Sequence, residues 1–308
     1  MVGKSISEDD LVDLHGKVVI LTGGNTGIGY ATIQMLARKG AKVYMAARSE
    51  ERAADAIKRL KSEDIKDGSV HWHKLDLADP RAAKQSAREF LEKEQRLDIL
   101  INNAATAVDQ VDIMTINHLS HSAFTDVLLP LMKTTASESG SDVRLVTVAS
   151  MKHADAKPST FTKEMLTSKK TATSYTTVME LYSLSKLATI LYTKALQMRF
   201  NAAAIPITCL TLHPGVISTR GSMATVRTIP FVGRLAPILP LLLGSWREGA
   251  LTVAFAAAGK EVAAQREKYQ GAYLVPVAKI ATPSSFALDA RLREEVYEST
   301  ELALKELE

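Results

Sequence analysis

The chain has 308 residues, of which 46% are hydrophobic and 23% charged, and its formal net charge is +4. This composition is typical of a soluble globular protein with a full hydrophobic core, and the basic residues are interspersed with acidic ones rather than gathered in blocks, which argues against nucleic-acid binding. The single cysteine, Cys209, excludes an internal disulfide and fits a reducing compartment.

The chain begins with a polar stretch and then an apolar run. Residues 1–17 lack the apolar stretch of a signal peptide, so we expect a cytoplasmic protein. A β-branched strand over 17–21 leads into a glycine-rich segment at 22–29, and residues 30–38 show helical spacing of apolar side chains. Such a turn lets the backbone approach a ligand, and the N–H groups of the helix start attract a phosphate. This segment predicts a dinucleotide site, although a lone glycine-rich loop is often only a turn.

The second predicted strand, at 41–47, indicates which dinucleotide would bind. A charged helix over 50–60 follows it. The end of this strand meets the adenosine ribose in dinucleotide-binding folds, and an acidic residue there would hydrogen-bond a free 2′-hydroxyl. Here Ala47 is followed by Arg48, whose guanidinium can grip a 2′-phosphate. We therefore predict NADP(H), with NAD less favoured; the alternative is that Arg48 is only a solvated charge at the start of the helix.

Strands and helices continue to alternate in the middle of the chain. Strands are predicted at 70–75, at 97–105 with a polar exit of small residues, and at 143–149, with helices at 79–93 and 114–132 between them. This alternation predicts a parallel sheet with helices on both faces, and in such sheets ligands bind outside the carboxyl ends of the strands. The chain positions at those ends are the glycine-rich segment, Arg48, Asp76, residues 102–105 and Ser150.

A candidate acid/base pair lies in the second half of the chain. Residues 151–177 form a polar insertion with room for one short helix, and the next helix runs to about residue 200. Tyr182 and Lys186 lie four residues apart on that helix, so the phenol and the ammonium share one face. By itself this spacing is weak evidence, because most such pairs are solvated helix surface.

The remaining elements are a strand at 205–212 with a Pro214-Gly215 loop, an apolar segment at 229–244, a helix at 246–258, a strand near 272–275 and a helix from residue 289. The apolar segment is shorter than a membrane span and is interrupted by charge and proline. We expect a lid over a lipophilic substrate, with core packing and shallow membrane contact as alternatives.

We expect residues 1–308 to form one dinucleotide-binding and catalytic domain. Within it, 15–220 would be the cofactor and catalytic core, 221–270 the substrate lid region, and 271–308 the C-terminal strand and helix.

An ordered set of motifs resembles the short-chain dehydrogenase/reductase family across residues 15–280. The set comprises Thr22-Gly-Gly-Asn-Thr-Gly-Ile-Gly29, Asn102-Asn-Ala-Ala105, Asn117, Ser150, Tyr182-xxx-Lys186 and Pro214-Gly215. The segment 182–191 and the long gap between Ser150 and Tyr182 look most like the retinol-dehydrogenase-like branch and its fungal relatives. The resemblance implies a Rossmann fold, a doubly wound parallel sheet with helices on both faces.

The resemblance also implies roles for individual residues. Ser150 would hydrogen-bond the substrate oxygen and Tyr182 would pass it a proton. Lys186 would hold the ribose hydroxyls and lower the Tyr182 pKa, and Asn117 would hold a water that links Lys186 to solvent. The residues implied at the cofactor are Gly23, Asn25, Thr26, Gly27, Ile28, Gly29, Arg48, Asp76, Leu77, Asn103, Ala104, Ala105, Tyr182, Lys186, Pro214, Gly215, Ile217 and Thr219. Ala105 departs from the glycine that is usual in the family and adds a methyl group near the nicotinamide or the substrate.

The expected function is therefore NADP(H)-dependent interconversion of a carbonyl and an alcohol on a hydrophobic small molecule. The alternative is a nucleotide-binding protein of the same fold with an isomerase, cyclase or scaffold role. We expect no nucleic-acid partner, at most peripheral membrane contact and, by analogy with the fold, a possible homodimer. We also expect no metal site, because the histidine pairs His71/His73 and His118/His121 lack a converging carboxylate or cysteine.

Overall fold

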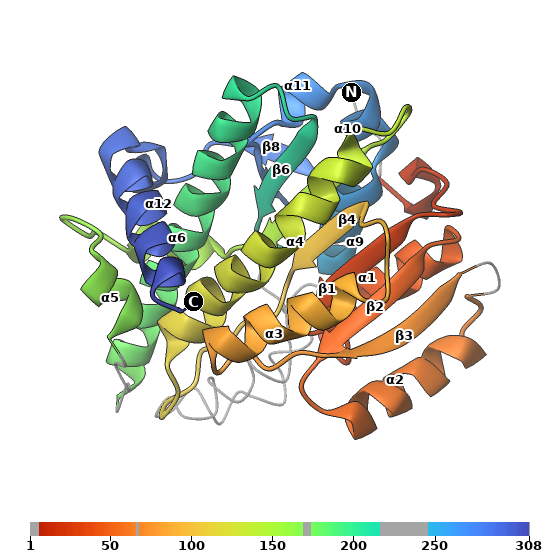
Figure 1. Cartoon of the computed structure of the whole chain (residues 1–308), viewed down its shortest axis with the longest axis horizontal. Helices are drawn as coiled ribbons and strands as arrows, with labels where there is room; N and C mark the ends of the chain where they lie inside the picture. Colours follow the sequence, from red (N-terminus) through yellow and green to blue (C-terminus); the bar gives the residue numbers. More distant parts are fainter. Residues whose placement is uncertain (1–5, 66–67, 169–173, 216–245, 308) are drawn as a thin grey trace.

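A single mixed sheet organises the part of the chain that the computed structural model describes, residues 6–65, 68–168, 174–215 and 246–307 (Figure 1). Its order is β3-β2-β1-β4-β5-β6-β7-β8. All neighbouring strands are parallel except β7 and β8, which form an antiparallel pair. The strands are β1 (Val18–Thr22), β2 (Lys42–Ala47), β3 (Ser69–Lys74), β4 (Ile99–Asn102), β5 (Val143–Val148), β6 (Ile207–Leu212), β7 (Tyr273–Val275) and β8 (Lys279–Ala281).

Helices cover both faces of the sheet, which confirms the predicted doubly wound architecture. The helices are α1 (Gly27–Arg38), α2 (Glu50–Ser62), α3 (Pro80–Leu91), α4 (Ser120–Ala136), α5 (Lys163–Thr167), α6 (Tyr175–Ala202), α9 (Trp246–Ala258), α10 (Lys260–Ala264), α11 (Arg266–Tyr269) and α12 (Ala290–Lys305). Short 3-10 turns lie at Glu8–Asp10, Met151–Asp155 and Ser285–Leu288, and a π-helical turn, Thr115–Leu119, precedes α4.

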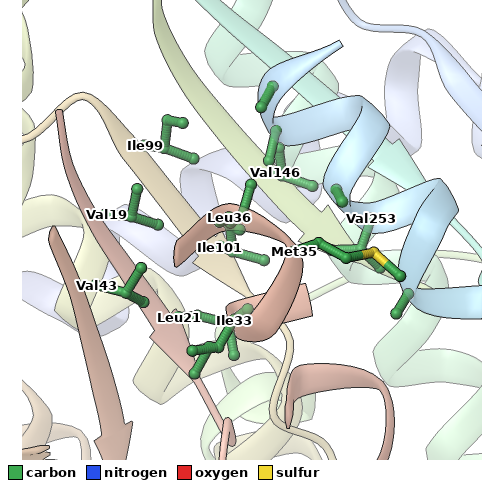
Figure 2. Close-up of a cluster of buried hydrophobic side chains, with 14 of the residues drawn as sticks. Val19, Leu21, Ile33, Met35, Leu36, Val43, Ile99, Ile101, Val146 and Val253 are labelled. Atoms are coloured by element: carbon green, nitrogen blue, oxygen red, sulfur yellow. The ribbon is translucent and has the colours of Figure 1, made fainter. Parts of the chain in front are cut away.

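Successive side chains of each strand point to opposite faces, so the sheet separates two hydrophobic cores. Val19 and Leu21 of β1 join one core, which includes α1, α2 and α9. Val18 and Ile20 join the other, which includes α3, α4, α6 and α12. Figure 2 shows the first core, where Leu36 of α1 and Val253 of α9 lie among side chains of the central strands. Burial on both faces explains why the central strands are continuous apolar runs.

Local capping signals fix where several helices begin. The Ser49 hydroxyl accepts the Arg52 N–H at the start of α2, and Asp79 caps α3 with proline in its first turn. The Ser174 hydroxyl caps α6. These side chains satisfy N–H groups that have no partner inside the helix.

The structure differs from the sequence prediction in three places. The polar insertion holds the turn Met151–Asp155 and α5, and α6 already begins at Tyr175. The short helices α10 and α11 and the edge strand β8 were not predicted, because three to five residues are too few to show a period. The sheet is therefore not wholly parallel, since β8 returns beside β7 as a hairpin.

In the part of the chain that is described, no helix is both long enough and apolar enough to span a bilayer. The apolar segment at 229–244 lies outside the described residues.

Candidate active site

The carboxyl ends of the parallel strands bring the predicted site residues to one edge of the sheet. The glycine-rich turn follows β1, Asn103 to Ala105 follow β4, and Ser150 follows β5. Pro214 and Gly215 follow β6, while Tyr182 and Lys186 lie on α6. Residues that are far apart in the sequence thus meet where a doubly wound sheet binds its ligands.

The turn after β1 has the shape of a phosphate cradle. Gly23 has φ +73°, and a Cβ added to Gly29 would lie 2.5 Å from the Gly23 carbonyl oxygen and 2.8 Å from Asn103 Nδ2. Only glycine fits these two positions. Helix α1 then begins without a side-chain cap at Thr26, which leaves the N–H groups of its first turn, at Gly27, Ile28 and Gly29, for an anion. Asn25 lies in the same turn, so these residues fit the diphosphate of a dinucleotide.

Arg48 lies at the end of β2 with an exposed side chain. Among the described residues, no hydrogen bond or ion pair to its guanidinium is found, although several other arginines of the chain are paired in this way. Asp76, half-buried after β3, accepts the Ala78 N–H, and Leu77 beside it is buried. These residues border the position that the adenosine ribose takes in dinucleotide-binding folds.

Tyr182 and Ser150 form a hydrogen-bonded pair. The Tyr182 side chain is half-buried. Burial raises its pKa, and the hydrogen bond with the Ser150 side chain lowers it in part, with a net increase. The expected lowering of this pKa by Lys186 is not found among these influences. Tyr182 is therefore a protonated phenol at neutral pH, the form that can donate a proton.

Lys186 lies one turn further along α6 and is 2% exposed. Its Nζ donates to the Val148 carbonyl oxygen at 2.6 Å and lies 5.8 Å from the centre of the Tyr182 ring. Burial lowers its pKa to about 7. The ammonium thus lies between the end of β5 and the tyrosine, and among the described residues it makes a single hydrogen bond.

Asn117 lies in the π-helical turn before α4, a distortion that is frequent at functional sites. Its Oδ1 accepts the Thr106 N–H (2.7 Å), and its Nδ2 donates to the Thr106 carbonyl (2.9 Å) and to Ser185 Oγ (3.0 Å). Ser185 Oγ in turn donates to the Tyr182 carbonyl. Both amide hydrogens are engaged, so the Asn117 side chain has none left to donate to a water.

The remaining predicted residues frame the site. Ala104 is half-buried, whereas Ala105 is exposed in the loop after β4. Gly215 has φ +100°, and its N–H donates to His213 Nδ1, which shapes the turn that follows β6. Ile217 and Thr219 lie outside the described residues.

Sequence reasoning missed several residues that support the site. Ser185 links Asn117 to the helix of Tyr182, and Thr106 links it to the loop after β4. The Thr22 hydroxyl accepts the N–H groups of Asn103 and Ala104. Thr22 opens the glycine motif and Ser185 precedes Lys186, so proximity to the motifs was the only available signal. No cluster of three or more potential metal ligands is found among the described residues.

Comparison with known proteins identifies close relatives. A family model described as short chain dehydrogenase matches residues 17–180. A short-chain dehydrogenase/reductase from Armillaria gallica is 40% identical over 307 residues, which cover 97% of this chain and 96% of the relative. Retinol dehydrogenase 14 of Mus musculus is 34% identical over 281 residues, which cover 84% of this chain and 78% of the relative.

Solved structures show the same fold. An uncharacterized protein from Mycobacterium Paratuberculosis is similar with a TM-score of 0.70 at 27% identity, over 98% of both chains. The Pseudomonas aeruginosa RhlG/NADP active-site complex is similar with a TM-score of 0.64 at 24% identity, over 89% of this chain and 98% of that one.

Proposed function

Because the chain belongs to the short-chain dehydrogenase/reductase family, we propose that it is an NADP(H)-dependent oxidoreductase that interconverts a carbonyl and an alcohol on a hydrophobic small molecule. The observation that carries this proposal is the arrangement of Ser150, Tyr182 and Lys186. A protonated phenol hydrogen-bonds a serine hydroxyl, and a buried ammonium lies 5.8 Å from its ring. These groups can stabilise and protonate an oxygen that becomes negative during reduction.

The protein's own residues handle the proton. A bound nicotinamide cofactor supplies the hydride for reduction, or accepts it in the reverse reaction. Ser150 hydrogen-bonds the substrate oxygen, and Tyr182 gives that oxygen its phenol proton as the new C–H bond forms. Lys186 would bind the ribose hydroxyls and, in its protonated form 5.8 Å from the ring, would favour the resulting phenolate by its charge, although this influence on the Tyr182 pKa is not found without the cofactor. In oxidation the same tyrosine takes the proton back.

Replacement of Tyr182 tests the proton-donor role. The Tyr182→Phe variant keeps the ring but has no proton to give, so turnover should fall at least ~100-fold while NADPH binding stays near the wild-type value. Turnover is followed by NADPH absorbance with a panel of apolar ketones and aldehydes. Tyr175→Phe, on the same helix and 44% exposed, is the matched control and should retain activity.

The same experiment separates the two functional classes. If the wild-type protein binds NADPH but oxidises it with none of the carbonyls, a non-redox role of the same fold would replace this proposal. Undiminished turnover in Tyr182→Phe would show that Tyr182 is not the proton donor.

Arg48 supports the choice of NADP(H) over NAD(H). An exposed guanidinium without a described protein partner, at the end of β2, suits a 2′-phosphate. Arg48→Ala should weaken NADPH binding by about tenfold or more and NADH binding much less. Arg52→Ala, an exposed arginine in the first turn of α2, is the control. Equal losses for both cofactors would show that Arg48 is only a solvated charge.

Two observations support a hydrophobic substrate. One is the similarity to Retinol dehydrogenase 14, whose name gives an apolar alcohol as its substrate. The other is the apolar composition of residues 229–244. Catalytic efficiency should therefore rise with the length of an aliphatic aldehyde. A preference for short, polar carbonyls would contradict this substrate class.

A further inference from the structure

His121 is a buried histidine close to the proposed cofactor site. It lies on α4 and is 4% exposed. Its Nε2 is 3.0 Å from the hydroxyl of Thr22, the last residue of β1. Thr22 is wholly buried and directly precedes the glycine-rich turn.

The hydrogen bonds of the Thr22 hydroxyl determine which atom carries the proton. The Asn103 and Ala104 N–H groups each donate to Thr22 Oγ1 at 2.9 Å. A hydroxyl oxygen accepts two hydrogen bonds and donates one. Both acceptor positions are therefore filled, and the hydroxyl proton is directed to His121 Nε2. The Thr22 network thus assigns the neutral tautomer with its own proton on Nδ1, a buried atom for which no hydrogen-bond partner is found among the described residues.

The environment of His121 keeps it in this neutral form. Burial, followed by the charge of Lys186, lowers its pKa to about 3, while the backbone of Ile116 and Asn117 acts in the opposite direction. A protonated Nε2 would find no free lone pair on Thr22. His121 therefore serves as a permanent hydrogen-bond acceptor over the whole physiological pH range.

The loop after β4 is held at two points from the same helical segment. Thr22, backed by His121, holds the N–H groups of Asn103 and Ala104. Asn117 holds both the N–H and the carbonyl of Thr106. The loop contacts the glycine-rich turn on its other side: Asn103 Nδ2 donates to the Thr22 carbonyl at 2.8 Å.

The contact between the loop and the glycine-rich turn leaves little room for adjustment. A Cβ on Gly23 would lie 3.0 Å from both Cα and Cβ of Ala104. A shift of Asn103 and Ala104 would therefore displace the turn that is suited to bind phosphate.

We propose that His121 is a positioning residue for the cofactor site: by accepting the Thr22 hydroxyl proton, it orients that hydroxyl to hold Asn103 and Ala104 against the glycine-rich turn. Its effect on cofactor binding rests on the proposed NADP(H) function, whereas its effect on the loop does not.

Hydrogen–deuterium exchange tests the loop without any cofactor. In His121→Leu the Thr22 hydroxyl loses its acceptor and must turn toward another one, so the amides of a peptide covering residues 101–105 should exchange roughly tenfold faster. His121→Gln can place an amide oxygen near the Nε2 position and should restore slow exchange. His118→Leu is the matched control, because His118 is equally buried in the preceding π-helical turn but hydrogen-bonds Thr300 of α12.

NADPH binding to the same variants tests the consequence for the site. The dissociation constant should rise roughly tenfold in His121→Leu, return to within about threefold of wild type in His121→Gln, and stay unchanged in His118→Leu. In a Thr22→Val background, which lacks the hydroxyl, His121→Leu should have no further effect on binding.

The possible results separate this inference from the proposed function. Slow exchange and unchanged binding in a folded His121→Leu protein, or equal changes in His118→Leu, would overturn the positioning role. If His121→Leu does not fold, His121→Phe, which also lacks the acceptor nitrogen, replaces it, and additive effects of His121→Phe and Thr22→Val in their double variant would overturn the positioning role. If the wild type binds neither NADPH nor NADH, the proposed function fails, and the exchange data alone decide whether His121 holds the loop.

Discussion

At the scale of single residues, Lys186 shows a conflict between stability and the proposed function. Its ammonium is almost completely buried, and its one hydrogen bond among the described residues goes to the Val148 carbonyl. Burial without a carboxylate partner is unfavourable for a charge, and the pKa falls to about 7 as a result. A lysine in this position is explained by its proposed interactions with Tyr182 and the cofactor, because its burial does not stabilise the fold.

The Lys186→Met variant should therefore be more stable and less active. Removing the buried ammonium should raise the free energy of unfolding of the cofactor-free protein by roughly 1–3 kcal/mol at pH 7, while carbonyl reduction falls at least ~100-fold. Between pH 7, near the folded pKa of Lys186, and its ordinary pKa of 10.5, the unfolded state binds more protons than the folded state. The free energy of unfolding of the wild type therefore rises with pH, and the advantage of the variant becomes smaller. Urea unfolding at pH 7 and pH 9.5 checks both the sign and the trend. A variant that is less stable at pH 7 would contradict this view.

At the scale of secondary-structure elements, Asp98 fixes the beginning of β4. It is 1% exposed, and its carboxylate accepts the Val18 N–H of β1 (2.9 Å) and two hydrogen bonds from Arg96 (2.7 and 2.8 Å). Its own carbonyl accepts the Arg144 N–H of β5. One residue thus sets the starting positions of three strands, at the end of the sheet opposite the candidate active site.

Asp98→Asn should destabilise the protein by about 2–3 kcal/mol, since it leaves Arg96 without its buried partner. Burial alone would raise the Asp98 pKa, but the bonds from Arg96 and Val18 and the charge of Lys17 outweigh it, and the pKa is lowered. The stabilisation is therefore complete above the ordinary value of 3.8 and is lost as pH falls through the lower, folded value.

Unfolding of wild type and Asp98→Asn by urea at pH 8, 6 and 5 checks this prediction. The difference in free energy should be constant over that range, because the carboxylate is fully ionised throughout. Asp142→Asn would not serve as a control, because Asp142 pairs with the buried Arg144. Asp155→Asn, whose exposed pair with Lys152 contributes little, is suitable. A difference that grows steadily as pH falls from 8 to 5 would contradict the assignment.

The π-helical turn before α4 links the element scale to the site. It lets Asn117 and His121 both reach the loop after β4 from one helical segment. Asn117 contributes through its side-chain amide, and His121 through the hydroxyl of Thr22. The loop that lies next to the proposed nicotinamide position is thereby attached to the second hydrophobic core of the sheet.

At the scale of the whole molecule, burial of histidines makes the fold sensitive to acid. Burial is the main cause that lowers the pKa of six of them: His71, His73, His118, His121, His153 and His213. The largest shifts are those of His118, to about 4, and His121, to about 3. None of these side chains belongs to a metal-ligand cluster among the described residues, and four of them are buried and hydrogen-bonded: His73, His118, His121 and His153.

The free energy of unfolding should therefore fall as pH falls below the ordinary histidine pKa of 6.5. Below pH 6.5 the histidines of the unfolded chain bind protons, whereas the buried histidines of the folded chain stay neutral. The free energy of unfolding therefore rises with pH in this range. Each histidine contributes at most about 1.4 kcal/mol per pH unit, and His118 and His121 together about 3.

Urea unfolding between pH 7.5 and 5 measures this slope. The His118→Gln variant should show a shallower slope, because it removes one group that stays neutral on folding. A free energy that is flat between pH 6.5 and 5 would show that these histidines are protonated in the folded state as readily as in the unfolded one.

The amino-acid sequence by itself determined the alternation of elements and the place of the proposed catalytic motifs in it. Every strand predicted in the described part of the chain occurs and starts within two residues of its predicted start, because buried parallel strands are continuous apolar runs and the helices between them have a distinct period. The positions of glycine and capping residues in the sequence also indicate local geometry, which is why the glycine-rich turn after β1 could be located. Short elements such as β8 carry no such period.

Only the tertiary structure decided how the motifs are joined. Thr22 and His121 are 99 residues apart, and Asn117 and Ser185 are 68 apart, yet each pair is hydrogen-bonded in the interior. The pKa directions of Tyr182 and Lys186 were likewise not evident beforehand, because they depend on how completely each group is removed from water. Local patterns specify which chemical groups reach the edge of the sheet. The partners and desolvation that set their protonation come from contacts between distant segments, for which a single sequence has no periodic signal.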